Sequence, residues 1–292
     1  MHLETILADA AAITLPILAA ALGGLFTSAA GSLNVALEGL IVAGAFSFGV
    51  AADASGSIFL GTLTALACSI ALALLVAAAE DRLSANVFVA ALAVNLLVAG
   101  GIGLLAELVF GTKGVVPLPA TLSGRIDAGA LSGLPVIGPV LFRQRGATYL
   151  LAAACAAAVV VYKTTPFGLR VRAAGMNEGS LRITGVDPRG VRYLAFAMSG
   201  AACALAGVVL ARSVGAWVPN IASGRGWIAL AAIFLGGRRP GGIVVATMAF
   251  GLLLALSNAA QATLAVPAEL VLALPYAATA AAALLGRARR HG

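Results

Sequence analysis

Charged residues are scarce in this chain of 292 residues. Asp, Glu, Lys and Arg together make up 10% of the sequence and apolar residues 61%, whereas an ordinary soluble domain is about 25% charged. Mean hydropathy is correspondingly high, at +1.05. A surface with so little charge is poorly suited to water, so the composition argues against a soluble globular protein and indicates a lipid environment.

Residue types that carry catalysis are also few. The two histidines, His2 and His291, lie at the extreme ends, and no pair of carboxylates shares one helical face inside an apolar segment. The cysteines Cys68, Cys155 and Cys203 lie in apolar segments, without zinc or disulfide spacing. A Gly-rich phosphate loop ending in Gly-Lys-Ser or Gly-Lys-Thr is missing. We therefore expect no enzyme, and no metal or cofactor on this chain.

Basic residues are confined to the intervals between apolar segments. The net charge of +7 therefore does not form a stripe interleaved with aromatic residues, as a nucleic-acid surface would. We expect no nucleic-acid partner.

What the sequence does contain is a series of apolar segments of about the length that crosses a bilayer. They show no alternation with a period of two, so helices are expected rather than barrel strands. Glycines inside them, including Gly44, Gly49, Gly200 and Gly207, favour close helix packing. We predict an all-α, polytopic transmembrane bundle of about eight or nine spans, forming one domain over residues 1–292. The predicted segments are 6–26, 33–52, 57–79, 87–110, 147–162, 193–212, a short stretch at 227–235, 241–261 and 269–285.

Two polar intervals set the orientation. Interval 163–192 carries six basic and two acidic residues, so the positive-inside rule predicts that it is cytoplasmic. The first Lys or Arg of the chain is Arg82, which agrees with an external N-terminus and a cytoplasmic C-terminus. The Pro-rich interval 111–146 then forms an external loop. We expect the bacterial cytoplasmic membrane as the location.

The cytoplasmic interval contains signals for a short helix. Asn177 can cap a helix start and Gly185 can end one, which predicts a two-turn helix over 178–184. Such a helix is too short to be stable alone. Docking on a partner through Leu181 and Ile183 would explain it, and an ordinary solvated loop is the alternative.

Three separated segments resemble motifs of the permeases of ABC importers for nucleosides, simple sugars and branched-chain amino acids, with the nucleoside branch most similar. Residues 175–186, Gly-Met-Asn-Glu-Gly-Ser-Leu-Arg-Ile-Thr-Gly-Val, preceded by Thr-Pro-Phe-Gly-Leu-Arg at 165–170, resemble the ATPase-coupling loop. Residues 31–39, Gly-Ser-Leu-Asn-Val-Ala-Leu-Glu-Gly, resemble the N-terminal motif. Residues 224–232, Gly-Arg-Gly-Trp-Ile-Ala-Leu-Ala-Ala, resemble the late motif.

The resemblance implies a permease subunit that forms the solute pathway of an importer, with nucleosides as the first substrate class. It implies three protein partners: an ATPase subunit that binds Mg-ATP, a second permease that is identical or related, and an extracytoplasmic solute-binding protein. Alternative solutes are simple sugars, riboflavin or branched-chain amino acids, and a different class would be an ion-coupled secondary transporter. The residues implied in ATPase coupling are Gly175, Asn177, Glu178, Ser180, Leu181 and Gly185.

Four polar residues within the predicted spans are candidates for the pathway or a gate: Asn34, Glu38, Asn95 and Asn258. Glu38 lies near the inner end of its span, where it can either reach the membrane interface or brace the turn at residues 28–34, so a structural or gating role is expected. Asn95 and Asn258 are expected deep in their spans, where each can bond either a neutral solute or another helix.

Overall fold

The computed structural model describes residues 3–118 and 146–263. Within this part of the chain, seven helices are long and apolar enough to cross a membrane, namely α1 to α5, α8 and α10. The predicted all-α, polytopic fold is therefore confirmed. The predicted span 269–285 and residues 119–145 of the predicted external loop lie outside the described residues. The elements are α1 (Leu3–Ala29), α2 (Leu37–Ser55), α3 (Ile58–Leu83), α4 (Val87–Phe110), β1 (Val116–Pro117), α5 (Gly146–Thr164), α6 (Pro166–Met176), α7 (Glu178–Ile183), α8 (Pro188–Val214), β2 (Ala216–Trp217), α9 (Arg225–Leu235) and α10 (Pro240–Thr263).

Local sequence signals set many of the helix ends. Ser57 and Asn86 cap the starts of α3 and α4, each accepting a hydrogen bond from a backbone N–H of the first turn. Gly56 and Gly111 end α2 and α4 with φ of 64° and 68°, a conformation that favours glycine. These signals explain why α2, α3 and α4 follow one another through short turns.

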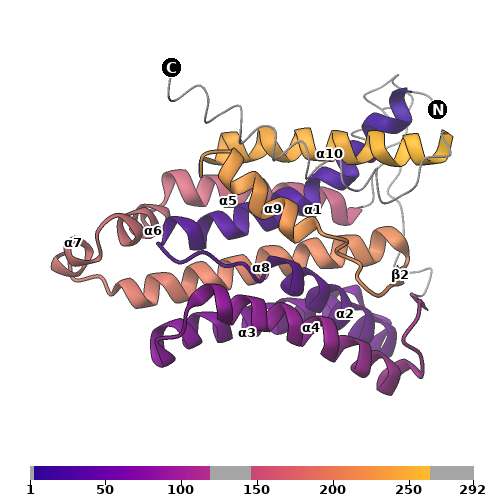
Figure 1. Cartoon of the computed structure of the whole chain (residues 1–292), viewed down its shortest axis with the longest axis horizontal. Coiled ribbons are helices and arrows are strands. Elements are labelled where there is room, and N and C mark those ends of the chain that lie inside the picture. Colours follow the sequence, from indigo (N-terminus) through magenta and orange to yellow (C-terminus); the bar gives the residue numbers. More distant parts are fainter. Residues whose placement is uncertain (1–2, 119–145, 264–292) are drawn as a thin grey trace.

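Helix α8 lies at the centre of the bundle, packed against α1, α2 and α3 (Figure 1). Small residues allow this approach, because a Cβ on Gly44 would lie 2.8 Å from the Ala204 Cα atom. A Cβ on Gly200 or Gly207 would meet the backbone of α3 or α2. The expected role of these glycines in close packing is confirmed. Gly49 differs, since its nearest neighbours would be at an ordinary 3.7 Å.

The predicted loop 163–192 is mostly helical. Beyond the expected short helix, now α7, it contains α6 and the first turn of α8, which begins before the predicted 193. Thr165 and Asp187 cap these two helices, and Pro166 and Pro188 occupy their first turns. Both starts were missed because the basic charge of the interval led to a loop being expected. α6 and α7 project at one end of the bundle (Figure 1).

A short strand pair and a short helix complete the fold. β1 and β2 pair antiparallel, with Val116 opposite Trp217, and they join the end of α4 to the end of α8. The short stretch predicted at 227–235 is α9, which packs on α1 and α10. Its 11 residues extend ~16 Å, about half of the ~30 Å hydrocarbon thickness, so α9 cannot cross a bilayer alone.

Candidate functional site

Residues 30–36, the junction between α1 and α2, are held by buried hydrogen bonds. Asn34 is fully buried; its Nδ2 donates to Ser199 Oγ at 3.1 Å, and its Oδ1 accepts from the Ala36 N–H at 3.0 Å. Its backbone N–H donates to Thr27 Oγ1. Asn34, a candidate pathway residue, is thus placed where it shapes the junction.

The end of α6 packs directly on this junction. A Cβ on Gly175 would overlap the Ala29 carbonyl oxygen and would lie 2.9 Å from the backbone nitrogen of Gly31. Gly31 has φ of 88°, in the left-handed region that favours glycine. The motif segments 31–39 and 175–186 therefore meet at Gly31 and Gly175. On the other side of the junction, Ser32 donates a hydrogen bond to Glu80 at the end of α3.

Glu38 joins the motif segment 31–39 to the motif segment 224–232. Its Oε1 accepts from the Gly224 N–H at 2.7 Å and its Oε2 from the Gly226 N–H at 2.6 Å. Gly224 is the N-cap of α9 and has no side chain to accept from the first turn, so the carboxylate of Glu38 supplies the acceptors. The structure therefore corrects the expected bracing of turn 28–34, because Glu38 holds the turn before α9 instead.

The two other polar candidates lie in different settings. Asn95 accepts from the Gly39 N–H at 2.8 Å and donates to the Val35 carbonyl at 3.1 Å, so it bonds α4 to the start of α2. Asn258 is exposed. It lies near the C-terminal end of the span in α10, rather than deep inside it as expected.

A pocket of about 390 Å³ lies beside Glu38 and Asn95. This volume falls within the range of about 300–1,000 Å³ typical of small-molecule sites. Its walls come from α2, α4, β2, the segment between β2 and α9, and the first turn of α9. The lining residues are Glu38, Gly39, Val42, Asn95, Leu96, Val98, Ala99, Ile102, Gly103, Trp217, Pro219, Asn220 and Trp227.

The segment implied in ATPase coupling forms a capped, projecting helix. Asn177 Oδ1 accepts from the Ser180 N–H at 3.1 Å, and Gly185 follows the helix with φ of 80°. Glu178 binds Arg192 of α8 with 2.5 Å between Oε1 and Nη1. The predicted cap and helix are thus present as α7.

The two apolar side chains of α7 face opposite environments. Leu181 is buried against its own chain, whereas Ile183 is 88% exposed. Met176, at the end of α6, is 87% exposed. The expected docking through Leu181 therefore needs correction, because Leu181 is buried, whereas Met176 and Ile183 are largely exposed.

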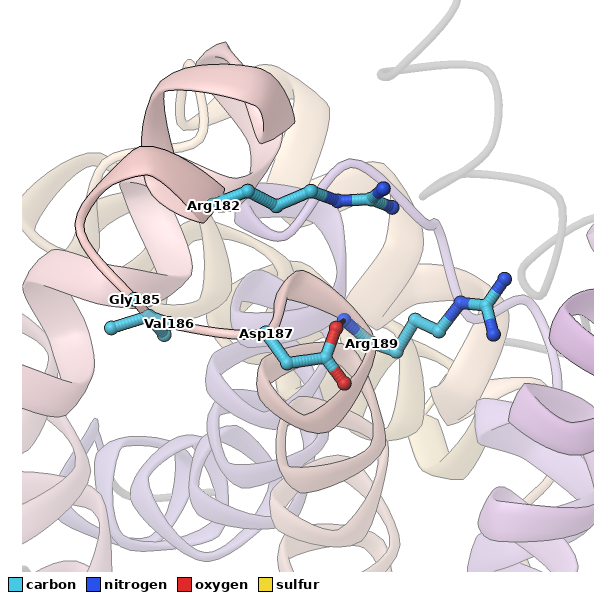
Figure 2. Close-up of a pocket in the computed structure, with 5 residues that line it drawn as sticks. All are labelled: Arg182, Gly185, Val186, Asp187 and Arg189. Carbon is cyan, nitrogen blue, oxygen red and sulfur yellow. Dashed lines mark hydrogen bonds between the residues drawn. The ribbon is translucent and has the colours of Figure 1, made fainter.

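A shallow concavity opens beside α7 and is lined by Arg182, Gly185, Val186, Asp187 and Arg189 (Figure 2). Both arginine side chains extend the same way in this view. Arg189 Nε lies 3.2 Å from Asp81 Oδ1 at the end of α3, while its backbone N–H donates to Asp187. The exposed end of the bundle is thus basic, and the ion pair of Arg189 with Asp81 ties it to α3.

Comparison with known families matches residues 6–283 to the branched-chain amino acid transport system permease component. The chain belongs to this permease family. The guanosine ABC transporter permease protein NupQ of Bacillus subtilis is 31% identical over 83% of this chain and 78% of its own length. The nucleoside ABC transporter permease protein NupC of Lactococcus lactis is 30% identical over 87% and 82%. A putative glucose ABC transporter permease protein, TsgC13 of Haloferax volcanii, is 31% identical over 84% and 74%.

The fold of the permease also resembles a solved structure. PsaBC from Streptococcus pneumoniae in complex with Fab includes a chain that matches with a TM-score of 0.52 and 15% identity. The match covers 96% of this permease and 90% of that chain. Together, the family and the apolar helices establish a multi-pass ABC transporter permease, which is a transport subunit.

Sequence reasoning missed the two tryptophans of this site. Trp217 and Trp227, the only tryptophans of the chain, both line the pocket. Trp227 lies in the motif segment 224–232, and its rarity in the chain, which has two tryptophans, could have marked it as a candidate site residue. Trp217 follows α8 in a strand pair that hydrophobic periodicity does not reveal.

Proposed function

We propose that this permease forms the solute pathway of an ATP-driven nucleoside importer in the bacterial cytoplasmic membrane. A separate ATPase with Mg-ATP, a second permease and an extracytoplasmic solute-binding protein complete the transporter. Nucleosides are proposed because two relatives that match most of the chain are named guanosine and nucleoside permeases. A sugar is the second candidate, because an equally similar relative is named a putative glucose permease.

The observation that carries the coupling proposal is the contact of Gly175 with the junction. α6 and α7 project at one end of the bundle, so a partner that moves them acts on α1 and α2 at Ala29 and Gly31. The junction leads to Glu38, which holds the start of α9 beside the pocket. ATP can drive transport only by favouring one permease state over another, and this chain of contacts is the proposed route.

The test is nucleoside-stimulated ATP hydrolysis in liposomes that contain the permease with its candidate ATPase and binding protein. Ile183→Asp places a charge on the exposed face of α7 and should abolish stimulation while leaving the permease folded. Val214→Asp is the matched control, because it adds the same charge at an exposed residue at the opposite end of α8. It should keep stimulation.

Either of two results would contradict the proposal. Stimulation that survives in Ile183→Asp would remove α7 from the ATPase contact. Glucose, and not guanosine, stimulating hydrolysis in the wild type would replace the nucleoside with the sugar. Leu181→Asp is unsuitable here, because Leu181 is buried and its loss would damage the packing of α7 itself.

A further inference from the structure

The segment between β2 and α9 is irregular backbone beside a membrane-spanning helix. It begins after Trp217, whose ring contacts Phe46 at the middle of α2, with 5.3 Å between the ring centroids. It ends at Gly224, whose N–H donates to Glu38 in the first turn of α2. Residues 218–224 therefore run beside α2 at membrane depth.

This segment exposes polar groups at that depth. The side chains of Asn220 and Ser223 are exposed, and both residues have a left-handed backbone, with φ of 55° and 47°. Lipid offers no hydrogen bonds, so irregular backbone at membrane depth is tolerated only where protein buries it or where it lines a water-filled cavity. Because the described part of the chain leaves these groups exposed, lipid is not a suitable neighbour for them.

Helix α4 contributes small residues to the same pocket. Asn95, Ala99 and Gly103 line it at a spacing of four residues, which places them on one edge of the helix. A Cβ on Gly103 would meet nothing within 4 Å. Another edge of α4 carries Leu97 and Leu104, which are 60% and 57% exposed and do not line the pocket. One edge thus faces a cavity with polar groups, whereas the other presents bulky apolar side chains that suit lipid.

The charge of the pocket is already engaged. Among the described residues that line it, the one charged side chain is Glu38, and its two oxygens accept from the N–H groups of Gly224 and Gly226. Arg225 interacts electrostatically with the same carboxylate. An ion therefore finds no unengaged charged group in these walls, and a neutral polar solute suits them better.

We propose that this face of the permease lines the water-filled pathway of the solute. The pathway face consists of residues 218–224 and the edge of α4 that carries Asn95, Ala99 and Gly103, and the Leu97 and Leu104 edge of α4 faces lipid. This assignment rests on the proposed function and adds where, within this chain, the pathway lies. Neighbouring residues of α4 then have different surroundings at one depth.

Thiol reactivity distinguishes water from lipid, because the thiolate is the reactive form and a thiol in hydrocarbon stays protonated. The three native cysteines are replaced by alanine, and Gly103→Cys, Asn220→Cys and Leu104→Cys each introduce one thiol. The complete transporter in membrane vesicles is treated with a water-soluble methanethiosulfonate, applied to each side with and without ATP. Gly103→Cys and Asn220→Cys should react at least about tenfold faster than Leu104→Cys.

Two glycines of α4 provide a matched test of obstruction. A Cβ on Gly101 or on Gly103 would meet nothing within 4 Å, but of the two only Gly103 lines the pocket. Gly103→Leu should therefore fill the pathway and reduce guanosine uptake severalfold. Gly101→Leu adds the same side chain outside the pocket and should leave uptake unchanged. Thermal unfolding of both variants checks that they are folded.

Equally slow reaction of all three thiols, in transporters that still take up guanosine, would overturn the pathway face. So would a disulfide between two copies of Gly103→Cys in place of labelling, since the face would then be a dry contact with a second permease. Equal guanosine uptake by folded Gly103→Leu and Gly101→Leu would contradict it as well. Absence of guanosine uptake by the wild type would overturn the nucleoside function alone, because the thiol measurement requires no nucleoside.

Discussion

Replacing Glu38 with Gln tests how the start of α9 is held. The carboxylate accepts one hydrogen bond on each oxygen, from the N–H groups of Gly224 and Gly226. A Gln side chain has the same length but only one acceptor, and it turns an NH2 group toward the other backbone N–H. One N–H at the start of α9 is then left without a partner, in a part-buried position.

The expected loss follows from these contacts. A hydrogen bond to a charged acceptor contributes about 1.5–3 kcal/mol, and a negative charge at a helix N-terminus adds about 0.3–1 kcal/mol. Glu38→Gln removes one such bond and the charge. We expect the free energy of unfolding to fall by about 2–4 kcal/mol.

The cysteines supply the assay. Cys155 and Cys203 are buried, so a thiol-reactive dye reports unfolding of the purified permease as the temperature rises. Glu107→Gln is the matched control: Glu107 pairs with Lys113 at 3.0 Å with both side chains exposed, and such pairs contribute about 0–1 kcal/mol. A clearly lower midpoint is expected for Glu38→Gln and a nearly unchanged one for Glu107→Gln. Equal midpoints for the two variants would refute the assigned role of Glu38.

Two further substitutions test the junction. Gly175→Ala should displace α6 from Ala29 and reduce nucleoside uptake. Gly190→Ala is the control and should leave uptake unchanged, because a Cβ there meets nothing within 4 Å. Equal uptake by the two variants would contradict the assigned contact between Gly175 and the junction. Asn34→Ala removes two buried side-chain hydrogen bonds and should lower the free energy of unfolding by about 1–3 kcal/mol. The loss is measured by unfolding in detergent, and an unchanged midpoint would contradict the role of Asn34 at the junction.

Features encoded within a few residues were predictable from the sequence. Asn177 and Gly185 correctly marked the limits of α7, because a cap bonds the first turn that follows it. Apolar length located the seven long helices. Thr165 with Pro166 carried an equally local signal for α6, but the basic charge of that interval led to a loop being expected instead.

Features that depend on distant residues were not predictable. Glu38 was recognised as a carboxylate within a predicted span, yet its partners lie 186 and 188 residues away. No pattern in one sequence specifies such a pairing. The burial of Leu181 and the exposure of Ile183 likewise depend on how α7 lies against α8, because a helix of six residues is too short for its periodicity to define a face.

The separation between Glu38 and the amides it binds has a consequence for biogenesis. At synthesis rates of about 5–20 residues per second, the 186 residues between Glu38 and Gly224 take roughly 10 to 40 seconds to emerge. During that interval α2 is in place while its carboxylate has neither of these partners. The nascent chain must therefore keep this group hydrated or protonated, and the N-terminal half reaches its final arrangement only after the start of α9 has been translated.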